Sequence, residues 1–376
     1  MYLLNTNKAM KNIGIILILC CIMHTCTGGI YAQTRVNLPQ NKNIIANFVL
    51  NEDDTTRYVN HYLFEQAYQV IEAMLTGKQE KSFREALFWV ECAYLQGTLD
   101  KTAFDKQIDD LTRELKVMAS YDKKAPTKDM ALNYAIFTLF YRPCPLNNNT
   151  PYTYDIRAII AERDRYQYGL VTHLLEEGKG SCRSLPYLYK ILADEIGAEA
   201  YLVAAPMHFF IRHRDHNGKW WNLETTTGSF RSSGSIIDEM HVPEAGIRSG
   251  LYMNNYDINA ELVLCLYDLA SIYEDLTGVY SNFFIRKCYT LGLQYSSPHI
   301  IESRKVEDMR YQLNKTAWNM GLRKEEELIN NPVLSIRHKE LEDEEKKIKD
   351  IGYYEFSPEE YRIQLERLVN YVNTPK

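Results

Sequence analysis

Apolar and polar positions alternate differently in three successive parts of the chain. From about residue 40 to residue 125 the apolar positions recur at helical spacing. The segment 82–97 begins with Ser82 and has Glu85 three residues later, which is the pattern of a helix N-terminal capping box. The next predicted helix starts at Asp100 and carries one apolar face, formed by Phe104, Ile108, Leu111 and Leu115.

The central part combines one helix with strands. Apolar residues at helical spacing predict a helix that Gly197 ends. Three strand-like runs follow, "AEAYLVAAP", "HFFIRHR" and "KWWNLETT". The last two are separated by a turn that contains Asn217-Gly218, a strong hairpin signal. The expected order is therefore a helix, a strand and an antiparallel pair.

From about residue 257 onward the pattern is helical again. Two consecutive segments, within 260–298, form a predicted helical hairpin of roughly tetratricopeptide size. The charged stretch 340–349 is typical of a solvated helix face. A last helix is expected from Ser357, with Pro358 at its first position.

The first 32 residues have the layout of a secretory signal peptide. A basic residue precedes an apolar run from Ile13 to Met23, which is too short to span a bilayer, and small residues follow. We expect cleavage after Ala32 and a periplasmic or secreted protein. Lipidation of Cys26 is the alternative, and it is less favoured because "MHT" before it matches a lipoprotein signal poorly. No other run is long and apolar enough to cross a membrane.

Charge and cysteine usage exclude several classes of protein. The net charge of −6 gives no reason to expect a nucleic-acid partner. The five cysteines beyond the signal peptide are scattered, with no CxxC, so neither a disulfide framework nor a structural zinc site is expected. They are Cys92, Cys144, Cys182, Cys265 and Cys288.

No cofactor and no metal is expected either. A dinucleotide fingerprint is absent from the sequence. His213, Asp215 and His216 gather at the predicted hairpin tip, where an exposed polar turn explains them better than a metal site does.

Three residues of the central part are candidates for thiol chemistry. Such chemistry needs a thiolate, a base that takes and returns the proton, and a group that holds the base in one tautomer. Cys182 precedes the predicted helix, where backbone N–H groups and the helix dipole favour an anion. Pro186 cannot donate to the Cys182 carbonyl, so we expect either a distorted first turn or regular helix that begins near Pro186. His208 and Glu224 fall on the two strands of the hairpin.

The numbering of the hairpin tests whether His208 and Glu224 can meet. An odd number of loop residues puts them on the same face of the sheet. A loop of residues 215–217 would place them directly opposite each other, with Cβ atoms about 4.5–5.5 Å apart. An even number would put them on opposite faces and exclude a triad.

Each of the three residues alone is more often structural. A lone cysteine is among the residues most often buried as inert core. His208 can be a satisfied core histidine, and Glu224 can be a surface strand residue. Their order along one helix start and two consecutive strands is what favours a shared function.

The segment 178–228 also resembles a known family. "GKGSCRSLPYLYKILADEIGAEAYLV", the "PMHFFIR" strand and "WWNLETT" are similar to the core of the transglutaminase-like superfamily, which is related to papain. The resemblance implies that Cys182 is the nucleophile, His208 the base and Glu224 the orienting acid, where the family more often has Asp. It also resembles a bacterial branch in which tetratricopeptide-like helices follow this lobe and many members lack the cysteine.

The sequence therefore predicts an α+β protein with a transglutaminase-like lobe between two helical regions. The expected parts are a signal peptide (1–32), an N-terminal helical region (33–128), the lobe (129–250) and a C-terminal helical region (251–376). The expected function is thiol-dependent acyl transfer or hydrolysis on a peptide or amide. The alternative is a non-catalytic envelope protein that uses the lobe and its C-terminal helices to bind a peptide or protein partner.

Overall fold

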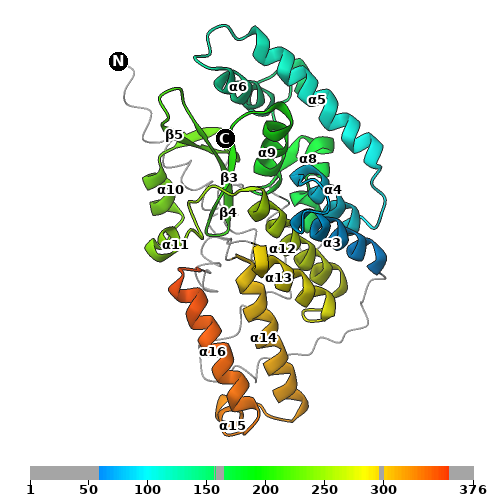
Figure 1. Cartoon of the computed structure of the whole chain (residues 1–376), viewed down its shortest axis with the longest axis vertical. Coiled ribbons are helices and arrows are strands. Elements are labelled where there is room, and N and C mark those ends of the chain that lie inside the picture. The colour runs from blue at the N-terminus through cyan, green and yellow to red at the C-terminus, as the bar shows by residue number, and fades with distance from the viewer. Residues whose placement is uncertain (1–58, 156, 158–164, 296–299, 355–376) are drawn as a thin grey trace, which may run out of the picture.

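The computed structural model of the chain describes residues 59–155, 157, 165–295 and 300–354. Over these residues the protein is mostly helical, with one four-stranded antiparallel sheet and one very short parallel strand pair (Figure 1). The mixed helix and strand composition predicted from the sequence is confirmed. The predicted signal peptide and the predicted last helix from Ser357 lie outside the described residues.

The N-terminal part consists of helices, as the apolar spacing predicts. Ser82 accepts a hydrogen bond from the backbone N–H of Glu85, and Asp100 accepts from the N–H groups of Thr102 and Ala103. Side-chain caps of this kind satisfy N–H groups that a helix leaves unpaired at its start. The helices described here are α3 (His61–Leu75), α4 (Phe83–Tyr94), α5 (Lys101–Tyr121) and α6 (Lys128–Tyr141).

The segment between α6 and the sheet contains more structure than the sequence predicts. Its start is rich in Pro and Asn, residues typical of loops, yet it holds one 3₁₀ turn and one strand. The buried side chain of Asn147 organises this turn, because it donates to the carbonyls of Leu139 and Arg142. The elements are η3 (Pro145–Asn147), β1 (Thr153–Tyr154), η4 (Arg165–Gly169), α8 (Val171–Glu177), β2 (Lys179–Gly180) and α9 (Ser184–Ile196).

The sheet is an antiparallel meander in the order β3-β4-β5-β6. The backbone of residues 253–256 continues it along the outer edge of β3, where the N–H groups of Met253 and Tyr256 donate to Ala204 and Leu202. The first three strands agree with the sequence prediction, whereas the fourth was not predicted because it is short and lacks an alternating pattern. The strands are β3 (Tyr201–Ala205), β4 (His208–Arg214), β5 (Trp220–Glu224) and β6 (Ser229–Arg231).

Helices lie on both sides of this sheet (Figure 1). α9 packs against β3 and β4. The short helices α10 (Ser233–Glu239) and α11 (Glu244–Arg248) lie on the other side. The Asn222 side chain of β5 joins the sheet to α10, because it donates to the Ser233 hydroxyl.

The C-terminal part consists of helices, and the first of them is central to the core. α12 contacts α3, α4, α13 and α14, and the largest buried cluster runs from Val59 to Ile301. A second, smaller cluster joins α14 to α16 at the lower end of the molecule in Figure 1. The helices are α12 (Ile258–Thr277), α13 (Phe283–Tyr295), α14 (Ile300–Asn319), α15 (Glu325–Ile329) and α16 (Leu334–Asp350). Within the described ranges, none of the helices combines the length and the apolar character needed to span a bilayer.

Candidate functional site

Cys182 lies in a tight turn directly before α9. The turn is held by two serines: the Ser181 hydroxyl accepts from the N–H groups of Arg183 and Ser184 at 3.1 and 3.2 Å. The Ser184 hydroxyl in turn accepts from the Ser181 N–H at 2.8 Å. This reciprocal capping of the helix start was not predicted, although the Ser-Cys-Arg-Ser spacing carries its signal.

Regular helix begins at Ser184, two residues before Pro186. The N–H of Leu185 donates to the Ser181 carbonyl and that of Tyr187 donates to the Arg183 carbonyl. Pro186 has no N–H, so it cannot donate the regular helical hydrogen bond to the carbonyl of Cys182. Its side chain is fully buried.

His208 and Glu224 lie on neighbouring antiparallel strands. His208 is the first residue of β4 and Glu224 the last residue of β5. The imidazole Nε2 lies 2.7 Å from Glu224 Oε2, and both side chains are 0% exposed. The same-face prediction is thus confirmed.

The hairpin loop is longer than the one that would place the two residues directly opposite. Arg214 pairs with Trp220, so the loop holds the five residues 215–219 instead of the three residues 215–217. The number is still odd, which preserves the face, but the register shifts by two residues. Continuing it places Phe210 opposite Glu224, so His208 meets Glu224 diagonally. A glutamate is long enough to span that diagonal.

The second carboxylate oxygen of Glu224, Oε1, also accepts hydrogen bonds. Oε1 accepts from the N–H and the hydroxyl of Thr226 at 3.0 and 2.6 Å. The acceptor carboxylate at Nε2 favours the tautomer that carries its proton there. The other ring nitrogen, His208 Nδ1, is buried and has no hydrogen-bond partner in the described part of the chain. The ring therefore presents Nδ1 as its basic atom.

Tyr141 of α6 supports the same turn, and the sequence carried no signal for it. Its hydroxyl donates to the Thr225 carbonyl at 2.8 Å, and its ring leaves no space for a side chain at Gly228. Burial first, and then Tyr189 and Glu224, raise the pKa of Tyr141 well above its ordinary value. It is therefore a neutral hydroxyl that can only donate to this carbonyl.

α9 packs against β4 through its first turns. The ring of Tyr187, in the first turns of α9, contacts the ring of Phe209 with centroids 5.9 Å apart. Phe209 points to the opposite face of the sheet from its neighbour His208. Because Nδ1 accepts no hydrogen bond within the described residues, the Cys182 thiol does not donate to it in this conformation.

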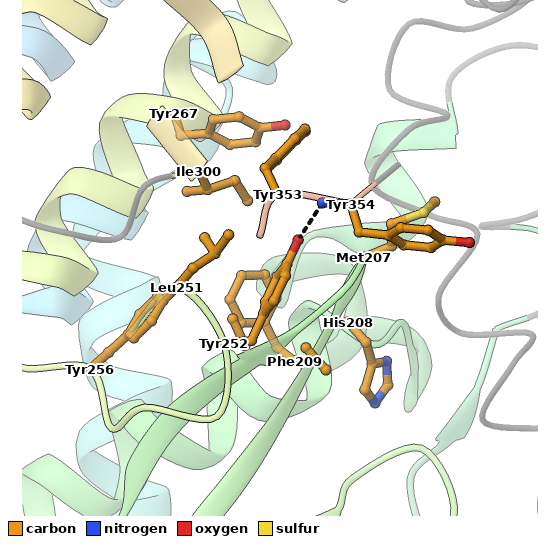
Figure 2. Close-up of a pocket in the computed structure, with 12 residues that line it drawn as sticks. Met207, His208, Phe209, Leu251, Tyr252, Tyr256, Tyr267, Ile300, Tyr353 and Tyr354 are labelled. Carbon is orange, nitrogen blue, oxygen red and sulfur yellow. Dashed lines mark hydrogen bonds between the residues drawn. The ribbon is translucent and has the colours of Figure 1, made fainter. Parts of the chain in front are cut away.

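A small pocket lies beside the backbone of His208. It is lined by the β3–β4 turn and by aromatic residues of later segments, and Figure 2 shows the imidazole ring pointing away from these aromatic rings. The hydroxyl of Tyr252 accepts from the N–H of Tyr354 at 3.4 Å, which closes one side of the pocket. Most lining residues are apolar or tyrosine: Met207, Phe209, Leu251, Tyr252, Tyr256, Tyr267, Ile300, Tyr353 and Tyr354.

All five described cysteines are buried. No two of the five described cysteines form a disulfide. Burial raises the pKa of the Cys92, Cys265 and Cys288 thiols, so these thiols stay protonated at neutral pH.

The hairpin tip behaves as a polar turn. Asp215 accepts from the N–H groups of Asn217 and Lys219 and from the Trp221 ring N–H. Among the described residues, no group of three or more His, Cys, Asp or Glu side chains is arranged to hold a metal ion.

Comparison of the chain with protein-family models, with curated proteins and with solved structures finds no match. The functional argument therefore rests on the geometry of the site.

Proposed function

We propose that this chain is an exported protein with a transglutaminase-like lobe that performs thiol-dependent acyl transfer or hydrolysis on a peptide or amide. The observation that carries the proposal is the buried His208–Glu224 pair, in which the carboxylate occupies Nε2 and leaves Nδ1 as the basic nitrogen. A second point of support is the capped turn that presents Cys182 at the start of α9.

The proposed reaction uses three groups. His208 Nδ1 takes the proton of Cys182, and the thiolate attacks the carbonyl carbon of the substrate. The C–N bond breaks, the imidazolium returns its proton to the leaving amine, and a thioester remains. Water or a second amine, deprotonated by His208, then attacks the thioester and releases the thiolate. Glu224 holds the imidazole and stabilises its protonated form, and the Cys182 N–H would supply one oxyanion donor.

A non-catalytic binding role is the second candidate, and one observation favours it. Cys182, His208 and Glu224 are each at most 1% exposed, so a substrate reaches them only if neighbouring segments move. In that role the pair would serve to hold β4 and β5 together inside a lobe that binds a peptide or a protein.

Labelling with iodoacetamide across pH, quantified for each cysteine by mass spectrometry, separates the two functions. Under the proposed function Cys182 labels with a midpoint at least about one unit below the ~8.5 of an ordinary thiol. His208→Ala should abolish labelling of Cys182 near neutral pH. A Cys182 that labels no faster than Cys265, and does not respond to His208→Ala, would rule out the enzyme.

A further inference from the structure

The residue after Cys182 is anchored in a cluster that the proposed reaction does not use. The Arg183 guanidinium lies 2.5 Å from the Asp268 carboxylate of α12, measured from Nη2 to Oδ2. Both side chains are buried, at 7% and 1% exposure. The peptide unit that joins Cys182 to Arg183 is thereby tied to the central helix of the core.

Two tyrosines complete the cluster. The hydroxyls of Tyr166 in η4 and Tyr187 in α9 lie 3.3 and 3.2 Å from the Asp268 oxygens and donate to them. Their rings also cover the guanidinium, with centroids 4.6 and 5.3 Å from Arg183 Cζ. A guanidinium between two ring faces and a carboxylate is held in one orientation.

Stability alone does not explain a buried pair of this kind. Apolar residues of similar volume often replace a buried ion pair with no loss, because desolvating two charges offsets most of their attraction. The pair does restrict the geometry of the chain around Arg183. Ser181 restrains the same turn from the other side of Cys182 through its two hydrogen bonds.

We propose that Arg183 and Asp268 are positioning residues that hold the Cys182 turn in the geometry the thiol needs to meet His208. The inference rests on the proposed function, which it deepens. The two residues act through the backbone and do not touch the substrate. Asp268 neutralises Arg183, so the pair acts by position and leaves stabilisation of the thiolate charge to His208.

The structure offers a matched control pair. Arg304 of α14 and Glu274 of α12 form a second buried ion pair, with side chains 7% and 3% exposed. It involves the same central helix and the same kind of contact, but it joins α12 to α14 and not to the Cys182 turn. A general loss of stability would affect both pairs alike.

The experiment compares Arg183→Met/Asp268→Asn with Arg304→Met/Glu274→Gln in the mature chain. The carboxamide that Asp268→Asn introduces keeps one oxygen that can accept from one tyrosine hydroxyl, and its NH2 group can donate to the oxygen of the other hydroxyl. We expect amide hydrogen exchange of residues 180–184 to rise roughly tenfold or more in the first variant only, and its Cys182 labelling to fall roughly tenfold to a hundredfold. Urea unfolding of each variant normalises the exchange for global stability. If the first variant fails to fold, Arg183→Lys, which keeps the charge but loses the planar fork, takes its place.

The outcomes separate this inference from the proposed function. The positioning role would be overturned if amide exchange of residues 180–184 were unchanged in the first variant. It would also be overturned if that exchange became faster while Cys182 labelling stayed unchanged. Either result leaves a reactive wild-type thiol in place. A wild-type thiol that is inert and indifferent to His208→Ala would refute the acyl-transfer function. The exchange measurement would then still decide whether the pair holds the turn.

Discussion

Two histidine–carboxylate pairs within residues 155–224 are alike in distance and differ in surroundings. His208 and Glu224 are 2.7 Å apart and fully buried. His173 of α8 and Asp155 are 3.0 Å apart, with exposures of 13% and 2%. Asp155 is also bound by the Arg157 guanidinium, with contacts between 2.7 and 3.2 Å.

The difference shows what makes a histidine pair useful for chemistry. Arg157 already neutralises Asp155, and hydrogen bonds from Arg157 and His173 outweigh burial to lower the pKa of Asp155. The backbone N–H of Asp155 donates to the Gly180 carbonyl, so the His173–Asp155 pair stabilises the strand that leads to Cys182. Within the described residues Glu224 has no such cation, and its donors are His208 and Thr226. Under the proposed function, His208 is therefore the candidate base, and His173 has a structural role.

The largest difference between the two pairs should appear in the rate of Cys182 labelling when each imidazole is removed separately. His208→Ala removes the proposed base, which would also be the cation beside the thiolate, so labelling of Cys182 at pH 7 should fall at least about tenfold. His173→Ala should change the rate of Cys182 labelling by no more than about twofold, because β2 keeps its other hydrogen bonds. Equal losses in both variants, measured by mass spectrometry per cysteine, would remove the distinction between the pairs.

Truncating the carboxylates should have the next largest effect, on stability. Glu224→Ala leaves buried donors of His208 and Thr226 without a partner, which costs about 2–3 kcal/mol in the free energy of unfolding. Asp155→Ala should cost less, about 1–2 kcal/mol, because Arg157 is 42% exposed and can turn to water. Urea unfolding followed by circular dichroism measures both. The comparison fails if the Asp155 variant is the less stable one.

The pH dependence should distinguish Asp155, whose pKa is lowered, from Asp268, whose pKa is raised. The lowered pKa of Asp155 means that its stabilisation is present above about pH 4 and is lost as pH falls through the folded value. Burial, opposed by Arg183 and by the hydroxyls of Tyr187 and Tyr166, raises the pKa of Asp268 to about 6. Its contribution has the opposite sign: it is present below about pH 4 and is lost as pH rises through about 6.

Unfolding between pH 3 and 7 therefore gives two difference curves. The free energy of unfolding of the wild type minus that of Asp155→Asn should increase as pH rises through the acidic range. The free energy of unfolding of the wild type minus that of Asp268→Asn should decrease between about pH 4 and 6. Two curves of the same sign would contradict the assigned effects of burial on the two carboxylates.

The smallest effect concerns the second anchor of Glu224. Thr226→Val removes the hydroxyl that donates to Oε1 and should cost about 1 kcal/mol, with a few-fold slower Cys182 labelling. Thr227→Val is the matched control, because the Thr227 hydroxyl bonds to Ser229 and not to Glu224. Labelling that slows equally in both variants would show that Thr226 does not orient the carboxylate.

Local patterns predicted the elements that carry the candidate site. The run "HFFIRHR" coincides with β4, and the run "KWWNLETT" contains β5 and extends beyond it at both ends. Gly197 ends α9 in the left-handed conformation. The parity of the hairpin sufficed to place His208 and Glu224 on one face. It could not fix the register, because Asp215 organises a wider turn with bonds to Lys219 and Trp221 that a dipeptide signal does not encode.

Long-range contacts were beyond the sequence patterns. Tyr141 reaches Thr225 across 84 residues, and Arg183 reaches Asp268 on a helix that follows the whole sheet in the chain. Both depend on how α6, α9 and α12 pack, and neither leaves a periodic or motif signal. For the same reason β1 and β2, each two residues long, were not predicted.

The central position of α12 has a consequence for how the chain acquires its structure. Sixteen of its twenty residues are buried, and it packs on α3 and α4, which precede it by more than 160 residues. Contacts separated by so much chain require a large loop to close before they stabilise anything. The N-terminal helices therefore cannot complete their core until residue 277 has been synthesised. An expression fragment that stops before α12 should emerge as an aggregation-prone intermediate.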